Sequence, residues 1–386
     1  MLYYIKKLKH FILKNIYNMF CVFPIKNNRM FFSNFSGKRY GDNPKYISEK
    51  IHEINPNIEI IWSKAKGYEF ETPDYVKVVR NPSVQFFYYM ATSKIWVDSH
   101  LKRSWMKKRK KQYFFETWHG GLGFKKIEND VENNTNDLKF EKKNAIHTSN
   151  MADVFLSNSE WVENVYRSAF KYNGKIMRFG FPRNDVFFKD NTTLIEKVKK
   201  HFNAGEKKII LYAPTFRDDF DKSIFDIDFE KITECFEKKF NCECVMLIRL
   251  HPMMINESKT CFNYSEKVMN ATMYSDAQEI LIASDYIITD YSSIIFDFML
   301  MKKPGFLYTP DLDKYKKERG FYSDFSFYPF PHACDVENLI SNISDFDELA
   351  YLKKLELFVE KVGLAENGHA TEKVCEVLMK EINKEK

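Results

Sequence analysis

The stretch IITDYSSIIFD, residues 287–297, decides how this chain is predicted to fold. An apolar run ends at Thr289 and a helical pattern begins near Ser292, so the segment predicts a buried strand that turns directly into a helix. Asp290 or Ser292 can act as the N-cap. First-turn amides with the hydroxyls of Ser292 and Ser293 beside them form an arrangement that binds phosphate without a metal ion. Ordinary helix capping is the alternative interpretation.

The same alternation of strand and helix extends in both directions along the chain, which is typical of α/β proteins with parallel sheets and helical crossovers. Apolar runs predict strands at 29–33, 58–63, 94–99, 112–118 and 154–157, and then at 208–212, 244–250, 286–289 and 305–308. Helical patterns lie between several of them, at 43–54, 83–92, 161–170, 229–240, 276–283 and 292–301. Because open parallel sheets bind ligands beyond the carboxyl ends of their strands, these junctions are where chemistry is expected.

Length and composition favour two folded domains with a cleft between them. The chain has 386 residues, of which 44% are hydrophobic and 29% charged, so it can build cores and is not disordered. The polar stretch 191–207 is the best linker candidate. We therefore predict an amphipathic segment at 1–26, an N-terminal Rossmann-like acceptor domain at 27–190, a linker at 191–207, a C-terminal Rossmann-like donor domain at 208–365 and a C-terminal helix at 366–386.

The net charge indicates the kind of partner, and the cysteine content indicates the compartment. A net charge of +6 suits anionic ligands or an anionic membrane surface and is too low for a nucleic-acid-binding protein. Seven cysteines without a disulfide framework indicate a reducing compartment. Cys242 and Cys244 lack further ligands for a metal site. Asp218, Asp219 and Asp221 are interpreted as a solvated loop rather than a metal cluster.

The first 26 residues predict a basic amphipathic helix rather than a signal peptide or a membrane span. Its apolar positions recur at helical spacing beside a basic face, a pattern typical of helices that lie in the interface of an anionic leaflet. Packing against the rest of the protein is the alternative. The apolar positions are Leu2, Ile5, Leu8, Ile12, Ile16 and Met19.

A second junction, TWHGGLGFKK at 117–126, follows the predicted strand at 112–118. Its three glycines let the backbone approach a ligand closely. His119 is the kind of group that accepts a proton near neutral pH, although a structural histidine is the alternative. Neither a complete dinucleotide fingerprint nor a P-loop occurs in the sequence.

Two further strand ends carry polar side chains suited to phosphate. Arg249 and His251 share a parity at one strand end and present two donors side by side. Thr215 and Arg217 follow another strand and can reach a phosphate or an acceptor. Arg319 belongs to a weaker cluster, for which a surface salt bridge is the alternative.

Seven short segments, in this order, resemble the CDP-glycerol glycerophosphotransferase family of teichoic-acid primases and polymerases. The resemblance runs from about residue 30 to about residue 372. Its segments are FSG at 35–37 with DNP at 42–44, WHG at 118–120, GFPRND at 180–185, YAPTFR at 212–217, RLHP at 249–252, TDYSS at 289–293 and RGFY at 319–322.

The resemblance implies a GT-B-like fold of two Rossmann-type lobes, no bound metal or other cofactor, and peripheral attachment to the cytoplasmic face of the cell membrane. It implies transfer of glycerol phosphate, or a related alditol phosphate, from a CDP-linked donor to a hydroxyl of a lipid-linked or polysaccharide acceptor. CMP would be released, in teichoic acid-like or capsular polymer synthesis. Family members usually carry Thr-Pro where this chain has Gly121 and Leu122.

On this interpretation His119 is the general base and His251 a second catalytic residue. The expected substrate-binding residues are Trp118, Gly120, Thr215, Arg217, Arg249, Thr289, Asp290, Ser292, Ser293 and Arg319. Two alternatives remain, a GT-B glycosyltransferase that uses a nucleotide-sugar donor and a non-catalytic scaffold in a polymer-export complex.

Overall fold

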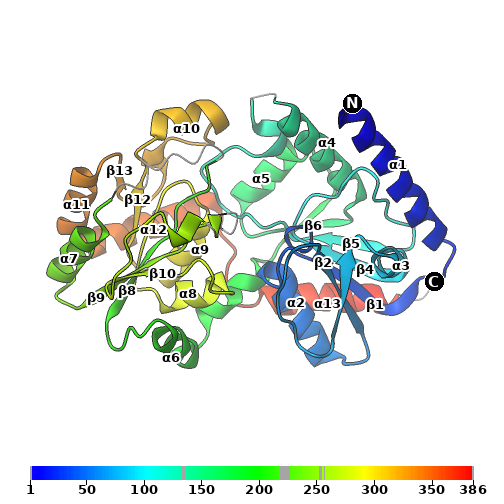
Figure 1. Cartoon of the computed structure of the whole chain (residues 1–386), viewed down its shortest axis with the longest axis horizontal. Helices are drawn as coiled ribbons and strands as arrows, with labels where there is room; N and C mark the ends of the chain where they lie inside the picture. Colours follow the sequence, from blue (N-terminus) through cyan, green and yellow to red (C-terminus); the bar gives the residue numbers. More distant parts are fainter. Residues whose placement is uncertain (1, 133–134, 218–226, 252–253, 256, 385–386) are drawn as a thin grey trace. The chain divides into compact units, whose positions relative to one another are not determined.

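The computed structural model describes residues 2–384 apart from 133–134, 218–226, 252–253 and 256. The chain divides into two compact units, each built on its own parallel sheet (Figure 1). Unit 1 comprises Met1–Gly121, Ile127–Asp185 and Leu364–Lys386. Unit 2 comprises Leu122–Lys126 and Val186–Gly363.

Unit 1 contains a seven-stranded sheet in the order β3-β2-β1-β4-β5-β6-β7, with every neighbouring pair parallel. The strands are β1 Lys26–Ser33, β2 Glu59–Ala65, β3 Val76–Asn81, β4 Ser93–Asp98, β5 Tyr113–Glu116, β6 Val154–Ser157 and β7 Lys175–Arg178. The chain reverses its direction of winding beside β1, so the gap between the ends of β1 and β4 is a topological switch point.

Helices cover both faces of the unit 1 sheet because successive residues of a strand point to opposite sides. Met30 and Phe32 pack in one core with α2 Asp42–Ile54 and α13 Ala370–Asn383. Phe31 packs in the other core with α1 and α3. The bounds of the remaining helices of this unit are α1 Leu2–Phe20, α3 Val84–Thr92, α4 Asn136–Met151 and α5 Glu160–Ala169.

Unit 2 repeats the plan with a six-stranded parallel sheet in the order β10-β9-β8-β11-β12-β13. Its switch point lies between β8 and β11. The strands are β8 Lys208–Tyr212, β9 Cys244–Ile248, β10 Val268–Asn270, β11 Tyr286–Thr289, β12 Gly305–Tyr308 and β13 His332–Ala333. The helices are α6 Thr192–His201, α7 Phe229–Phe240, α8 Ala277–Ala283, α9 Ile294–Phe298, α10 Leu312–Arg319, α11 Val336–Ser344 and α12 Glu348–Val362.

The predicted α/β class with two parallel sheets is confirmed. The stretch 191–207, expected to be a linker, holds α6, whose Val198 is buried. Two local predictions are wrong. The strand expected at 112–118 ends at Glu116, and the helix expected at 292–301 begins at Ile294 and has five α-helical residues. The predicted domain limits stay a prediction.

The described side chains of the N-terminal helix α1 divide between packed and exposed positions. Leu13, Ile16 and Phe20 contact the core that contains the buried Tyr17. Phe11 and Met19 project outward and are 65% and 69% exposed. Among the helices that the structure describes, none is both long and apolar enough to span a bilayer.

Candidate functional site

The carboxylate of Asp290 joins the strand ends at the switch point of unit 2. Its Oδ1 accepts hydrogen bonds from the amide of Thr215 at 2.8 Å and from the hydroxyl of Thr215 at 2.7 Å. Its Oδ2 accepts from Nη2 of Arg217 at 2.7 Å. Asp290 follows β11 and Thr215 follows β8, so one buried carboxylate sets the geometry of both loops.

Arg217 lies between two carboxylates. Its Nε donates to Asp311 Oδ2 at 2.8 Å, and its Nη1 donates to the carbonyl of Thr215 at 2.7 Å. The guanidinium also lies over the rings of Tyr291 and Tyr315. Burial by itself would lower the pKa of Arg217, but the two carboxylates outweigh it and raise the pKa above its usual value. Arg217 is therefore a permanent cation whose side chain organises the loop.

Asp311 is a residue of this network that the sequence interpretation missed. It also accepts a hydrogen bond from the hydroxyl of Tyr291 at 3.0 Å. The available signal was its position three residues after the end of β12, at the same edge of the sheet as Asp290. An acidic residue directly after a buried parallel strand is a candidate for this edge.

The polar residues after β11 divide into buried and accessible groups. The hydroxyl of Thr289 is buried and donates to the carbonyl of Ala213 at 2.6 Å, which ties β11 to the end of β8. Ser292 and Ser293 are partly exposed. The expected N-cap, Asp290 or Ser292, is wrong. The N-cap residue of α9 is Ser293, and the Asp290 carboxylate is instead held by Thr215 and Arg217.

The strand that carries Arg249 and His251 in the prediction ends earlier than expected, because β9 ends at Ile248. Arg249 is buried and donates to the carbonyls of Ala271 and Tyr274 at 2.9 and 2.8 Å. His251 is exposed. Arg319 ends α10 and is partly exposed. Of the predicted residues in unit 2, the structure thus brings Thr215, Arg217 and Asp290 into one network.

In unit 1, the imidazole of His119 has a defined hydrogen-bonding direction. Its Nδ1 lies 2.9 Å from the carbonyl oxygen of Ser99. Because a carbonyl can only accept, this bond requires the proton on Nδ1 and leaves Nε2 as the proton acceptor. The imidazole packs against the rings of Phe35 and Trp118, with centroid-to-centroid distances of 4.7 and 4.1 Å, and these contacts fix its plane. His119 is partly exposed.

The backbone around His119 is held from both sides. Trp118 adopts a left-handed φ of 51°, and its amide donates to Glu116 Oε1 at 2.9 Å. The carbonyl of His119 accepts from Nη1 of Arg183 at 2.9 Å. Nη1 of Arg183 also pairs with Asp42 at 2.8 Å. The sequence pattern assigned no role to Glu116. It also did not predict the pairing of Arg183 with Asp42, because these residues are 141 positions apart in the chain.

The pKa values of three ionisable groups near this loop are shifted, those of the buried Glu116 and Lys102 and of the partly buried His100. Burial raises the pKa of Glu116 to about 8, so its carboxyl is largely protonated at neutral pH. Burial lowers the pKa of Lys102 to about 8, with Glu116 opposing the shift. Burial, followed by the neighbouring His119, lowers the pKa of His100 to about 3. His100 is therefore neutral at physiological pH.

Asp218, Asp219 and Asp221, the carboxylates weighed as metal ligands, lie outside the described residues.

Comparison with known proteins identifies the family. The family of CDP-Glycerol:Poly(glycerophosphate) glycerophosphotransferases matches residues 15–380. A teichoic acid glycerol-phosphate transferase of Staphylococcus aureus is 31% identical, with 97% of this chain and 99% of the relative aligned. The solved wall teichoic acid polymerase TagF superposes with a TM-score of 0.84 at 26% identity, covering 98% of this chain and 97% of that one. A variant of TagF was also solved after soaking with CDPG.

The lengths of the relatives differ. A teichoic acid poly(glycerol phosphate) polymerase of Staphylococcus epidermidis is 28% identical over 94% of this chain, and the chain spans about half of that relative, 52% of its length. The likeness to TagF confirms the predicted GT-B-like class of fold.

Proposed function

The chain belongs to the CDP-glycerol glycerophosphotransferase family, and on that premise we propose that it transfers glycerol phosphate, or a related alditol phosphate, from a CDP-linked donor to an acceptor hydroxyl. The acceptor is a lipid-linked or polysaccharide chain of teichoic acid-like or capsular type, and CMP is released. The observation that carries this proposal is the alignment of nearly the whole chain with TagF, a variant of which was soaked with CDPG. Family membership favours this reaction over a glycosyltransferase or a scaffold.

Unit 2 is proposed to bind the donor. Ser292 and Ser293 are accessible at the switch point of the unit 2 sheet, where open parallel sheets bind nucleotides. We assign the diphosphate to these hydroxyls, with positive charge from Arg249 and Arg319 and a ring N–H from His251. Thr215, Arg217 and Asp290 are assigned the role of positioning the two loops, because their polar groups already bond to one another. Thr289 acts in the same way through Ala213.

Unit 1 is proposed to supply the general base. The acceptor hydroxyl attacks the phosphorus that carries glycerol, its proton passes to Nε2 of His119, and the bond from phosphorus to the CMP oxygen breaks. The hydrogen bond from Nδ1 to the carbonyl of Ser99 makes Nε2 the nitrogen that receives that proton, and it stabilises the imidazolium that forms. Trp118 and Gly120 flank this histidine and are assigned to the acceptor.

Helix α1 is proposed to attach the protein to the cytoplasmic face of an anionic membrane. Leu8, Ile12 and Met19, all on the predicted apolar face, are exposed. Exposed apolar side chains beside the basic residues of the same helix suit a bilayer interface.

A donor screen tests this function. The full chain is incubated with a lipid-linked acceptor and CDP-glycerol, CDP-ribitol or a UDP-sugar, and the products are analysed by mass spectrometry. Addition of an alditol phosphate with release of CMP is expected, and we expect the reaction to persist in EDTA. Transfer of a sugar from the UDP-linked donor alone would replace the proposal with the glycosyltransferase alternative.

A further inference from the structure

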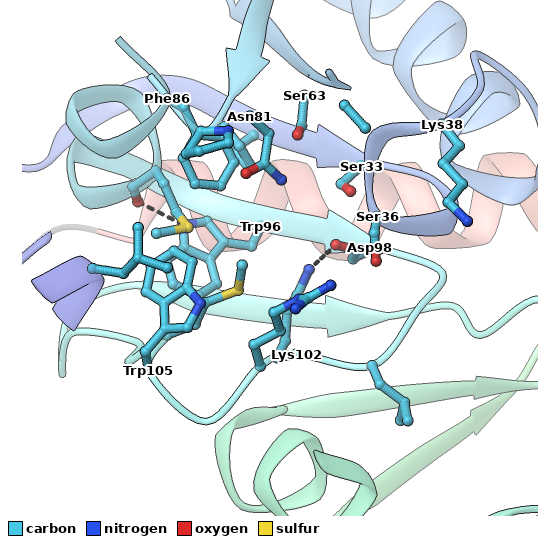
Figure 2. A pocket seen from close by; sticks show the side chains of 18 residues that line it. Ser33, Ser36, Lys38, Ser63, Asn81, Phe86, Trp96, Asp98, Lys102 and Trp105 are labelled. Atoms are coloured by element: carbon cyan, nitrogen blue, oxygen red, sulfur yellow. Dashed lines mark hydrogen bonds and ion pairs between the residues drawn. The ribbon is translucent and has the colours of Figure 1, made fainter. Parts of the chain in front are cut away.

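Unit 1 contains a pocket that the proposed reaction has not used. It has a volume of about 230 Å³, enough for about eight molecules the size of water. Its lining comes from the carboxyl ends of β1, β2, β3 and β4, from α1 and α3, and from the segment after β4 (Figure 2). The pocket therefore lies at the switch point of the unit 1 sheet, where ligands bind in folds of this kind.

The two sides of the pocket differ in chemistry. Figure 2 shows Phe86, Trp96 and Trp105 on one side and Ser33, Ser36, Ser63 and Lys38 on the other. Leu13, Phe31, Met90 and Met106 extend the apolar side. Such a division suits a ligand with one apolar end and one polar end.

The lining of the pocket carries net positive charge. Lys38, Lys102 and Arg103 line the pocket together with one acidic residue, Asp98, which forms an ion pair with Lys102. Three cations and one carboxylate leave an excess of positive charge for an anionic group.

Two lining residues hold polar atoms that need a partner. The hydroxyl oxygen of Ser63 and the indole Nε1 of Trp105 are buried, and neither bonds to any residue that the structure describes. Ser63 is 1% exposed and Trp105 4%. An indole N–H can only donate, so its partner must offer an acceptor oxygen. Because buried polar groups in native proteins are almost always hydrogen-bonded, these atoms point to a ligand that supplies such oxygens.

The pocket also lies next to the proposed base. Ser36 lines the pocket, and the ring of the neighbouring Phe35 packs on the imidazole of His119, with 4.7 Å between the ring centroids. Asp98 lines it, and the neighbouring Ser99 holds Nδ1 of His119. A molecule in the pocket would therefore share its walls with the acceptor side of the reaction.

We propose that this pocket binds a phosphate ester at the point where it joins an apolar chain. The phosphate oxygens face the serines, Lys38 and Arg103, and the first carbons of the chain lie against Trp96, Trp105 and Phe86. The assignment of this ester to the lipid-proximal part of the acceptor rests on the proposed function.

Binding is measured on the full chain by ligand-observed saturation-transfer NMR of butyl phosphate and butanol. Inorganic phosphate has no carbon-bound proton to observe, so its affinity is measured by its competition with butyl phosphate. Butyl phosphate should bind, and the saturation should be strongest at its methyl end. Butanol and inorganic phosphate should bind at least about tenfold more weakly, because butanol lacks the phosphate and inorganic phosphate lacks the apolar chain. Lys38→Ala/Arg103→Ala should weaken butyl phosphate about tenfold. Ala65→Leu, which adds a side chain into the pocket, should abolish it. Lys175→Ala, at an exposed position of β7, is the matched control and should change nothing.

Equal affinity for inorganic phosphate would make this a simple anion site, and equal affinity for butanol a simple apolar cavity; either result overturns the proposal. So does the absence of butyl phosphate binding, or its persistence in the charge variant. If Ala65→Leu fails to fold by circular dichroism, the charge variant decides alone. Donor turnover is assayed separately. Binding of butyl phosphate without release of CMP from CDP-glycerol would refute the proposed function and leave the pocket intact.

Discussion

Asp290 and Thr215, 75 residues apart in sequence, are joined by two hydrogen bonds of 2.8 and 2.7 Å from the amide and the hydroxyl of Thr215 to the same carboxylate oxygen. The other carboxylate oxygen accepts from Arg217. The loops that follow the two central strands of unit 2 are therefore fixed relative to each other. This relationship separates residues that shape the proposed donor site from residues that contact the donor.

Asp290→Asn should destabilise the protein by about 1–3 kcal/mol, because Arg217 would keep Asp311 but lose its charged partner Asp290. Chemical denaturation measures this loss, and Asp313→Asn, at an exposed position of α10, is the matched control.

The double variant Ser292→Ala/Ser293→Ala should have the opposite effect to Asp290→Asn, because it changes residues assigned to donor contact rather than to loop structure. It should weaken CDP-glycerol binding about tenfold while the free energy of unfolding stays within about 0.5 kcal/mol of wild type. A stable Asp290→Asn protein, or a serine variant with unchanged donor affinity, would contradict this division of roles.

His119→Ala should reduce turnover of CDP-glycerol by about 10²–10⁴-fold, the usual contribution of a general base. Affinity for the donor should not change, because the imidazole is assigned to the acceptor proton. Steady-state kinetics and calorimetric binding of CDP-glycerol separate the two effects. His369→Ala, whose side chain is 65% exposed, serves as the control. Turnover near that of wild type would remove His119 from the mechanism.

Glu116 should make stability depend on pH. Its pKa is about 8 in the folded protein and about 4.3 in an unfolded chain, so between these values the native state binds the proton more tightly. This contribution is complete below about pH 4 and is lost as the pH rises through about 8. Glu116→Gln keeps the neutral form, so its stability relative to wild type should grow between pH 5 and pH 8 by a few kcal/mol.

Urea denaturation at several pH values measures this difference. The comparison is made below pH 8 because Lys102, whose pKa is also about 8, contributes with the opposite sign above that value. A difference between the two proteins that does not change with pH would show that Glu116 is ionised in the fold.

Phe11→Ser/Met19→Ser should weaken binding to vesicles that contain anionic lipid by about tenfold or more, since both side chains are exposed and apolar. Co-sedimentation with vesicles measures the effect. Leu349→Ser on α12 is the control, because Leu349 is 81% exposed outside α1. Equal binding of the helix variant and wild type would exclude α1 as the membrane contact.

The sequence by itself determined the central strands and the order of the elements. The predicted limits of β6, β8, β11 and β12 coincide with the observed ones, because central parallel strands are buried on both faces and read as continuous apolar runs. The pattern did not delimit β3, β7, β10 and β13. All four are edge strands, which pair on one side only and alternate or carry polar residues, as in Val76–Asn81.

Only the tertiary structure decided which polar residues meet. The strand order brings Asp311 to Arg217 across 94 residues, and Arg183 to Asp42 across 141. It also gathers the lining of the unit 1 pocket from segments between Leu13 and Met106. Short-range patterns report burial and local conformation, whereas these contacts depend on which strand ends lie next to each other in a sheet. These contacts are therefore decided only when the sheet forms.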